Sequence, residues 1–335
     1  MLLFTSLGVL HRLSSIHAVV LSPILRDEVR ANPRRYVHVP LLILALTLLL
    51  SQAFAFHPAF TGLGHGTGQL WAFYVLAPVL VAWDRWHFCM QEFGVLSIYR
   101  ARASQSAGQD RRFDRVYVVV LMLIVNSVLY VRAGFGDDLQ VLWRGVGLAG
   151  LHGEPVLESL ARAACAAAVV LAIAALVREW RHERRSWPKA LYYMLIASHS
   201  IVLYLVPSAL SLFFLSYVFH HWMVAVGLFN RVTLNSYPPG SRVSRAARYL
   251  VRVGPWFGVC VFASLFLAPL DLTSKLTPTP TVHLFEGAST LARVGAGLVI
   301  GAFFGFSFLH YYYDRCLYSF SIEGVRRAVG PLLMR

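Results

Sequence analysis

The sequence is poor in charged residues, and acidic residues are the scarcest of them. Only 14% of the 335 residues are charged, with 16 aspartates and glutamates against 30 lysines and arginines, whereas 57% are hydrophobic. The mean hydropathy is +0.60. Because a typical soluble domain is about 25% charged, this composition excludes an ordinary soluble protein and predicts an all-α, polytopic transmembrane bundle.

No nucleic-acid-binding motif accompanies the net charge of +14. The basic residues are distributed over short loops between apolar runs and form no single basic face. We therefore expect the lipid bilayer, and no nucleic acid, as a partner. The positive charge is interpreted as a signal of membrane topology.

Cysteine is scarce too, and its spacing excludes several kinds of site. The four cysteines are Cys89, Cys165, Cys260 and Cys316, and no two of them form a CxxC pair. This excludes a zinc ribbon and a disulfide framework, and the absence of CxxCH excludes covalently attached c-type haem. Each cysteine lies in or beside a different apolar segment, where it is expected to act as a small apolar side chain.

Nine apolar runs are expected to be membrane helices. Their approximate bounds are 1–25, 39–56, 69–98, 116–132, 155–177, 190–206, 209–229, 253–270 and 287–312. The first run lacks a basic start and a clean cleavage site, so we expect a retained helix rather than a signal peptide. Pro207 separates two runs so closely that they form either a hairpin or one kinked helix. Since no repeat or composition break divides the chain, we expect a single membrane domain over 1–335 with a basic cytoplasmic tail at 313–335, ending in a short interfacial helix.

Alternate loops differ sharply in basic residues. One side of the predicted membrane receives twenty-three of the 30 lysines and arginines, in five clusters from Arg26 to Arg35, Arg100 to Arg115, Arg178 to Lys189, Arg231 to Arg252, and Arg315 to Arg335. The opposite loops contain three. By the positive-inside rule, the N-terminus is outside and the C-terminus is cytoplasmic in the cell membrane.

The stretch AWDRWHFCMQEFG, residues 82–94, places polar side chains inside an apolar run. A charge in hydrocarbon costs on the order of 2–4 kcal/mol, so such side chains usually face the interior of a bundle and bind something. On a helix, Asp84 and Gln91 share one face with His87, which is the pattern of a metal ligand held by hydrogen-bonding neighbours. Arg85 and Glu92 fall on other faces, where we expect charges that pair or extend to the membrane surface.

Four segments that run from outside to inside carry a histidine in their middle or inner part: His17, His87, His220 or His221, and His310. Four imidazoles are therefore expected to converge in one layer of the inner leaflet. A histidine cluster without anionic ligands favours iron, copper or zinc over magnesium or calcium. Because His220 and His221 lie about 100° apart around a helix, we expect one to bind and the other to orient or pack.

Two further residues extend the candidate site. Asp314 follows His310 by four residues, so its carboxylate could accept a hydrogen bond from the imidazole or bind the metal directly. His199 lies mid-membrane and is a candidate for a further ligand, a substrate-channel residue or a packing residue. His11 and His38 lie near segment ends without a supporting pattern. The loop histidines are excluded from the site: His57, His65, His152, His182 and His283.

Three stretches, WHFCMQEF, the run from Pro207 to FFLSYVFHHWM, and HYYYD, resemble the bacterial and archaeal Brp/Blh-type β-carotene 15,15'-dioxygenases. That family consists of polytopic membrane proteins with a histidine-bound non-haem iron. Its histidines follow the order of His17, His87, His220 or His221, and His310 with Asp314 here. In this chain the early histidine lacks the following glycine, and the paired histidines are neighbours rather than a turn apart. The resemblance implies ferrous iron and carotenoid cleavage to a retinal-type aldehyde.

Together these features predict a membrane-embedded oxygenase that uses non-haem iron and O₂ on an apolar small molecule such as a carotenoid or lipid. Aromatic residues, including Tyr217, Trp222 and Tyr311, are expected to line its cavity. The second candidate is a lipid desaturase or hydroxylase, although HxxxH and HxxHH boxes are absent. The sequence is also compatible with a different transition metal, with haem held by histidines of two helices, and with a non-enzymatic transport path. Substrate and oligomeric state are left open.

Overall fold

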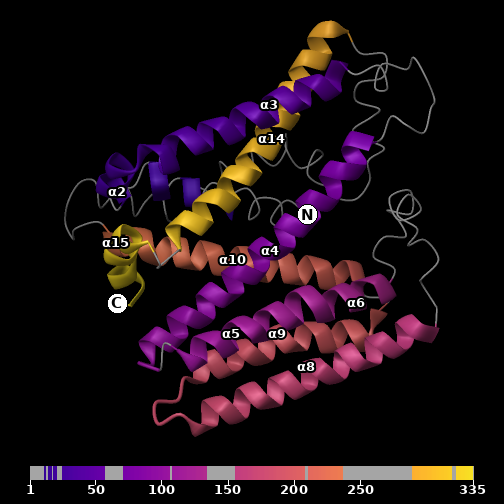
Figure 1. The fold of residues 1–335 in the computed structure, drawn as a ribbon, viewed down its shortest axis with the longest axis vertical. Helices are drawn as coiled ribbons and strands as arrows, with labels where there is room; N and C mark the ends of the chain where they lie inside the picture. The colour runs from indigo at the N-terminus through magenta and orange to yellow at the C-terminus, as the bar shows by residue number, and fades with distance from the viewer. Residues whose placement is uncertain are drawn as a thin grey trace. The chain divides into compact units, whose positions relative to one another are not determined.

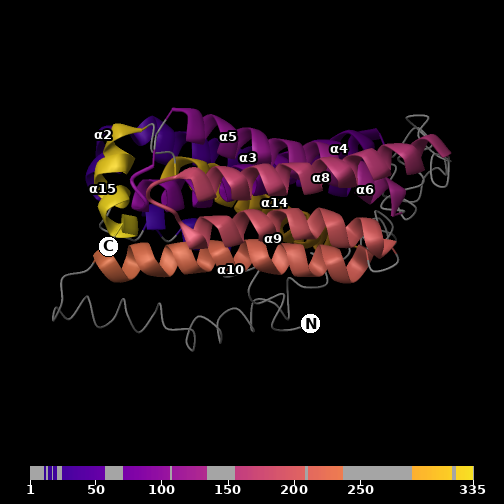
Figure 2. The same cartoon turned by 90° about the horizontal axis from the view of Figure 1, so that it is seen from below.

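In the computed structural model, the described residues of the chain are almost all helical and include no strand, in agreement with the all-α prediction (Figures 1 and 2). These residues are 11–12, 14–16, 18–20, 25–56, 71–105, 108–133, 155–207, 210–236, 289–318 and 322–334. Contacts divide the chain into two compact units. One comprises Met1–Phe73 and Trp222–Leu333, and the other comprises Tyr74–His221.

The first unit is built around two long helices, α3 and α14, which lie side by side in Figure 1. Its described helices are α2 (Arg26–Ala31), the π-helix η2 (Arg34–His38), α3 (Val39–Phe56), the second half of α10 (Leu210–Ser236), α14 (Thr290–Leu317) and α15 (Glu323–Met334). The sequence places α3 at the same residues. The predicted C-terminal helix is present as α15, and its apolar side chains Val325, Val329 and Leu333 are buried.

α14 approaches α3 closely because it presents glycines at a spacing of four residues, namely Gly297, Gly301 and Gly305. A Cβ added at Gly301 would lie 2.9 Å from the Cα of Leu48. Small residues at this spacing allow two membrane helices to bring their backbones together. The Gln52 side-chain amide also donates a hydrogen bond to the Val294 carbonyl at 3.1 Å. This packing fixes the helix that carries His310.

The second unit contains the helices that carry the other candidate residues. They are α4 (Trp71–Arg102), α5 (Gln109–Val119), the π-helix η5 (Val120–Val125), α6 (Asn126–Arg132), α8 (Pro155–Arg181), α9 (Trp187–Leu205) and the first half of α10. α9 ends at Leu205 and α10 begins at Leu210, so the chain at Pro207 joins two helices rather than forming one kinked helix. The Ser186 hydroxyl caps α9 by accepting a hydrogen bond from the Lys189 amide at 3.4 Å.

A stripe of alanines allows α8 to pack closely within this unit. The buried members are three or four residues apart: Ala161, Ala164, Ala168, Ala172 and Ala175. The opposite face of α8 exposes large apolar side chains such as Val170 and Ile173, and α3 likewise exposes Leu41 and Leu49. Exposed apolar surface of this extent is unusual in a soluble protein and suits contact with lipid.

An ionic network lies at one end of the second unit. Arg100 donates to Asp114 at 2.6 Å, and the Lys189 ammonium lies 3.3 Å from the same carboxylate. The Tyr193 hydroxyl also donates to Asp114. Lys189, expected in a loop, belongs instead to the first turn of α9 and is buried. Its charge is compensated by Asp114 and Glu179, as a buried charge requires.

Three helical stretches among the described residues are long and apolar enough to cross a membrane: Arg34–Ala53, Gln109–Arg132 and Pro155–Arg181. The chain therefore contains segments that could span a bilayer. The total of nine spans and the orientation of the termini stay predictions. The expected segment at 253–270 lies outside the described residues.

Candidate metal site

The first unit brings together two buried histidines, His11 and His310. Their ring centres are 4.0 Å apart, with the planes inclined at 73°. A hydrogen bond joins Ser15 Oγ and His310 Nδ1 at 2.9 Å. The Ser14 hydroxyl, by contrast, donates within its own segment to the His11 carbonyl at 2.7 Å. Ser15 therefore helps to hold the ring of His310 in place.

Asp314 was expected either to accept a hydrogen bond from His310 or to bind the metal directly. Its Oδ1 lies 3.7 Å from His310 Nδ1, which is beyond hydrogen-bond range. Ser15 is the hydrogen-bond partner of that nitrogen instead. Since Nδ1 is engaged in this way, Nε2 is the nitrogen of His310 that is suited to a metal. Tyr311 lies nearby, with its ring centre 5.4 Å from that of His310.

The second unit has a buried histidine pair of its own, His87 on α4 and His221 on α10. Their ring centres are 5.1 Å apart and the planes are nearly perpendicular, at 81°. Phe88 stacks on His221 with a centroid separation of 3.7 Å and an angle of 23°. This stacking restricts the orientation of the His221 ring. The next residue, Trp222, is buried as well.

Gln91 forms a hydrogen bond with His221 rather than with His87, the partner expected from the sequence. Its side-chain amide donates to the backbone carbonyl of His221 at 2.9 Å, so it ties α4 to α10 rather than orienting the His87 ring through that bond. Asp84 is half-buried on the same helix. Gln91 thus supports His221 through a helix-to-helix contact, whereas Asp84 interacts electrostatically with His87.

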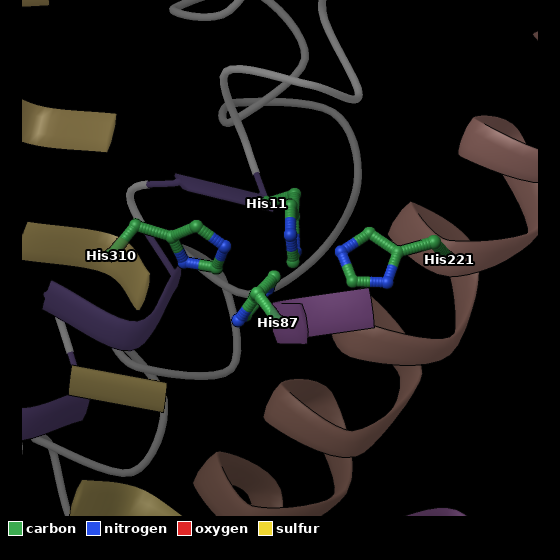
Figure 3. A group of neighbouring side chains, drawn as sticks. All are labelled: His11, His87, His221 and His310. Carbon is green, nitrogen blue, oxygen red and sulfur yellow. The ribbon is translucent and has the colours of Figure 1, made fainter. Parts of the chain in front are cut away.

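The structure describes one buried cluster formed by His11, His87, His221 and His310, and the rings face one another in Figure 3. Each histidine offers one ring nitrogen, and these nitrogens lie within 4.8 Å of one another. The side chains are between 0% and 7% exposed. This is a cluster of four histidines that could hold a metal ion. Three of its four members, His87, His221 and His310, are candidates from the sequence.

His11 is the member that the sequence patterns did not single out, while His17 lies outside the described residues. The sequence nevertheless contained a pattern that could have indicated His11. Ser14 and Ser15 follow it by three and four residues and share its helical face. Polar neighbours on one helical face are also what indicated His87. The signal at His11 is weaker because that residue lies in the first and least regular apolar segment.

His220 is not part of the four-histidine cluster. Its Nδ1 lies 3.7 Å from Glu92 Oε1, and its ring centre is 5.9 Å from that of His199. Of the two outcomes expected for Glu92, the structure agrees with pairing rather than with reaching the membrane surface, because its side chain is fully buried. Of the expected cavity residues, the Tyr217 side chain lies outside the described part of the chain. The cavity itself stays a prediction.

No protein-family model, curated protein or solved structure matches this chain. The assignment of a function therefore depends on the chemistry of its own side chains.

Proposed function

We propose that His11, His87, His221 and His310 bind one transition-metal ion, with ferrous iron as the first choice, and that the protein is a membrane-embedded oxygenase. The observation that carries this proposal is the convergence of four buried ring nitrogens within 4.8 Å. Buried imidazoles in such numbers are uncommon as packing residues, because each one has polar atoms that need partners. A shared metal would bind one nitrogen of each ring at once.

The donor set fits a first-row transition metal. Two nitrogens bound to one ion at about 2.1 Å lie at most about 4.2 Å apart. The observed limit of 4.8 Å is slightly wider, so small rotations of the side chains would close the set. Neutral imidazoles suit iron, copper and zinc, whereas magnesium and calcium prefer oxygen donors. Ser15 on His310 and Phe88 on His221 would hold these rings in orientation.

Haem is less compatible with this arrangement than a single ion. A haem iron held by two histidines takes its other four ligands from the porphyrin, whose plane lies between the two axial rings. With all four nitrogens within 4.8 Å of one another, the remaining two imidazoles would occupy the space of the porphyrin. The proposal therefore concerns a bare metal ion.

An oxygenase is the proposed chemistry because ferrous iron with histidine ligands and open positions supplies electrons to O₂. The apolar outer faces of α3 and α8 support access from a bilayer for an apolar substrate. Carotenoid cleavage is the first choice, on the resemblance in the order of the histidines. In that reaction one carbon–carbon double bond breaks, O₂ places one oxygen atom on each carbon, and two aldehydes form without another oxidant. Lipid desaturation or hydroxylation is the second choice.

Metal analysis of the detergent-purified chain tests this proposal. We expect bound iron, and substitution of any one cluster member, for example His87→Ala, should remove one equivalent per chain. Activity with β-carotene and O₂, measured as retinal formation, should fall to background in parallel. His17→Ala tests the sequence-based candidate directly and should retain the metal if His11 is the ligand. Exposed His38 provides the control His38→Ala. Full metal content in all four cluster variants would overturn the proposal.

A further inference from the structure

A second polar cluster lies entirely within the second unit, and it centres on Glu92 of α4. This carboxylate is fully buried. The Tyr192 hydroxyl donates a hydrogen bond to its Oε2. Among the described residues, Glu92 Oε1 has no hydrogen-bond partner, and neither does His220 Nδ1. A buried carboxylate that receives one hydroxyl donor still requires a cation or a proton for compensation.

The separation between Glu92 and His220 favours a cation. His220 Nδ1 and Glu92 Oε1 are 3.7 Å apart, whereas a hydrogen bond between such atoms would bring them to about 2.7–3.2 Å. Two ligands of one transition-metal ion, each at about 2.1 Å, lie between about 3 and 4.2 Å apart. The observed distance is therefore too long for a direct hydrogen bond and suits two ligands of one ion.

His199 is positioned as the third donor. Its ring centre lies 5.9 Å from that of His220, at an interplanar angle of 31°. An imidazole centre lies about 3.2 Å from an ion that it binds, so two rings on one ion have centres up to about 6.4 Å apart. His199 Nδ1 is within 2.8 Å of the Leu195 carbonyl. A backbone carbonyl in this position holds the orientation of the ring.

The helical spacing explains why these residues gather away from the four-histidine cluster. Glu92 follows His87 by five residues and therefore lies about 140° around α4, while His220 and His221 are about 100° apart on α10. Tyr192 and His199 are seven residues apart, so they share one face of α9. Each of α4 and α10 thus presents one ligand to the first cluster and another residue to the second.

We propose that Glu92, His199 and His220 form a second metal site, which binds a divalent first-row transition-metal ion through two histidines and one carboxylate. This donor set suits Fe²⁺, Mn²⁺ or Zn²⁺ and leaves coordination positions open. Tyr192 orients the carboxylate by its hydrogen bond to Oε2, so that Oε1 is directed to the ion. The site consists of three helices of one unit, and it does not depend on the function proposed for the first cluster.

Zinc titration of the chelator-treated, full-length protein in detergent tests the second site. Metal binding at the four-histidine cluster is first removed by the double substitution His11→Gln and His310→Gln. Both residues lie outside the helices that form the second site. This variant should still bind one equivalent of Zn²⁺, in competition with a chromophoric chelator. Adding Glu92→Gln or His199→Gln should weaken that binding by more than about 100-fold, because each removes a ligand rather than a neighbour of a ligand.

Matched controls make the same chemical changes elsewhere in the second unit. Glu158→Gln and His182→Gln should leave zinc binding unchanged, since these side chains contact Arg132 and Asp110 respectively. Circular dichroism and size-exclusion elution identify any variant that fails to fold, and the conservative change Glu92→Asp then replaces Glu92→Gln, with weaker rather than absent binding expected.

The outcomes separate the two sites. No zinc bound after removal of His11 and His310, or zinc binding that is insensitive to Glu92→Gln, overturns the second site and leaves the first untouched. Binding that disappears with Glu92→Gln but persists without His11 and His310 supports the second site. If the His11 and His310 changes alone remove no metal, the proposed function fails while the second site stands.

Discussion

The two ring nitrogens of His310 have different surroundings, and this difference decides which one is suited to a metal. Nδ1 is hydrogen-bonded to Ser15 at 2.9 Å, whereas Asp314 lies 3.7 Å from it. From sequence alone, Asp314 was the natural partner because it is four residues away on the same helix. Ser15 is 295 residues distant, so no local pattern could reveal it. Partners from distant segments are the part of a site that sequence spacing does not predict.

Ser15→Ala is expected to weaken metal binding at the four-histidine cluster without abolishing it. The change removes the hydrogen bond that fixes the His310 ring, and losses of this kind cost about 10–100-fold in metal affinity. Zinc titration against a competing chelator measures the effect. Ser14→Ala is the matched control, because its hydroxyl is bonded to the His11 carbonyl within the same segment. Equal affinities for the two variants would contradict the role given to Ser15.

At the scale of the helix, the sequence predicts where most elements lie but not which face meets which neighbour. The run at 39–56 became α3, and the runs at 155–177 and 190–206 became α8 and α9 within a few residues. Apolar length and Pro207 were sufficient for these assignments. The surroundings of the Glu92 side chain were not predictable from the sequence. An acidic residue near the end of an apolar run can form an ion pair, reach the membrane surface or be buried against partners on other helices.

The packing of α14 on α3 provides a direct test of helix contact. Gly301→Ala introduces a Cβ 2.9 Å from the Leu48 Cα, and the helices must separate to accept it. Overpacking of this kind typically costs about 1–3 kcal/mol, so the midpoint of thermal unfolding in detergent should fall. Gly295→Ala is the matched control, since a Cβ there meets nothing within 4 Å. If both variants unfold at the same temperature, the close contact at Gly301 is wrong.

For the whole molecule, composition predicts a membrane environment, and the apolar faces of α3 and α8 agree with it. Three described stretches are able to span a bilayer, and the remaining expected spans depend on the pattern of charge. That pattern is informative because moving arginine-rich loops across a membrane is strongly disfavoured during insertion. The pattern of charge does not predict the whole fold, however. Some basic residues, such as Lys189, are buried in ion pairs inside the protein and do not mark a side of the membrane.

The orientation of the chain can be tested with single cysteines in a variant that lacks Cys89, Cys165, Cys260 and Cys316. Arg184→Cys places a thiol in the exposed turn between α8 and α9, which belongs to the predicted cytoplasmic side. A membrane-impermeant maleimide should label it only after cells are permeabilised, because the four basic residues that remain between Arg178 and Lys189 oppose translocation of this loop. Thr61→Cys, in the predicted outer loop 57–68, should be labelled in intact cells. Labelling of Arg184→Cys from outside would reverse the topology, and it would move the expected cytoplasmic tail to the opposite face of the membrane.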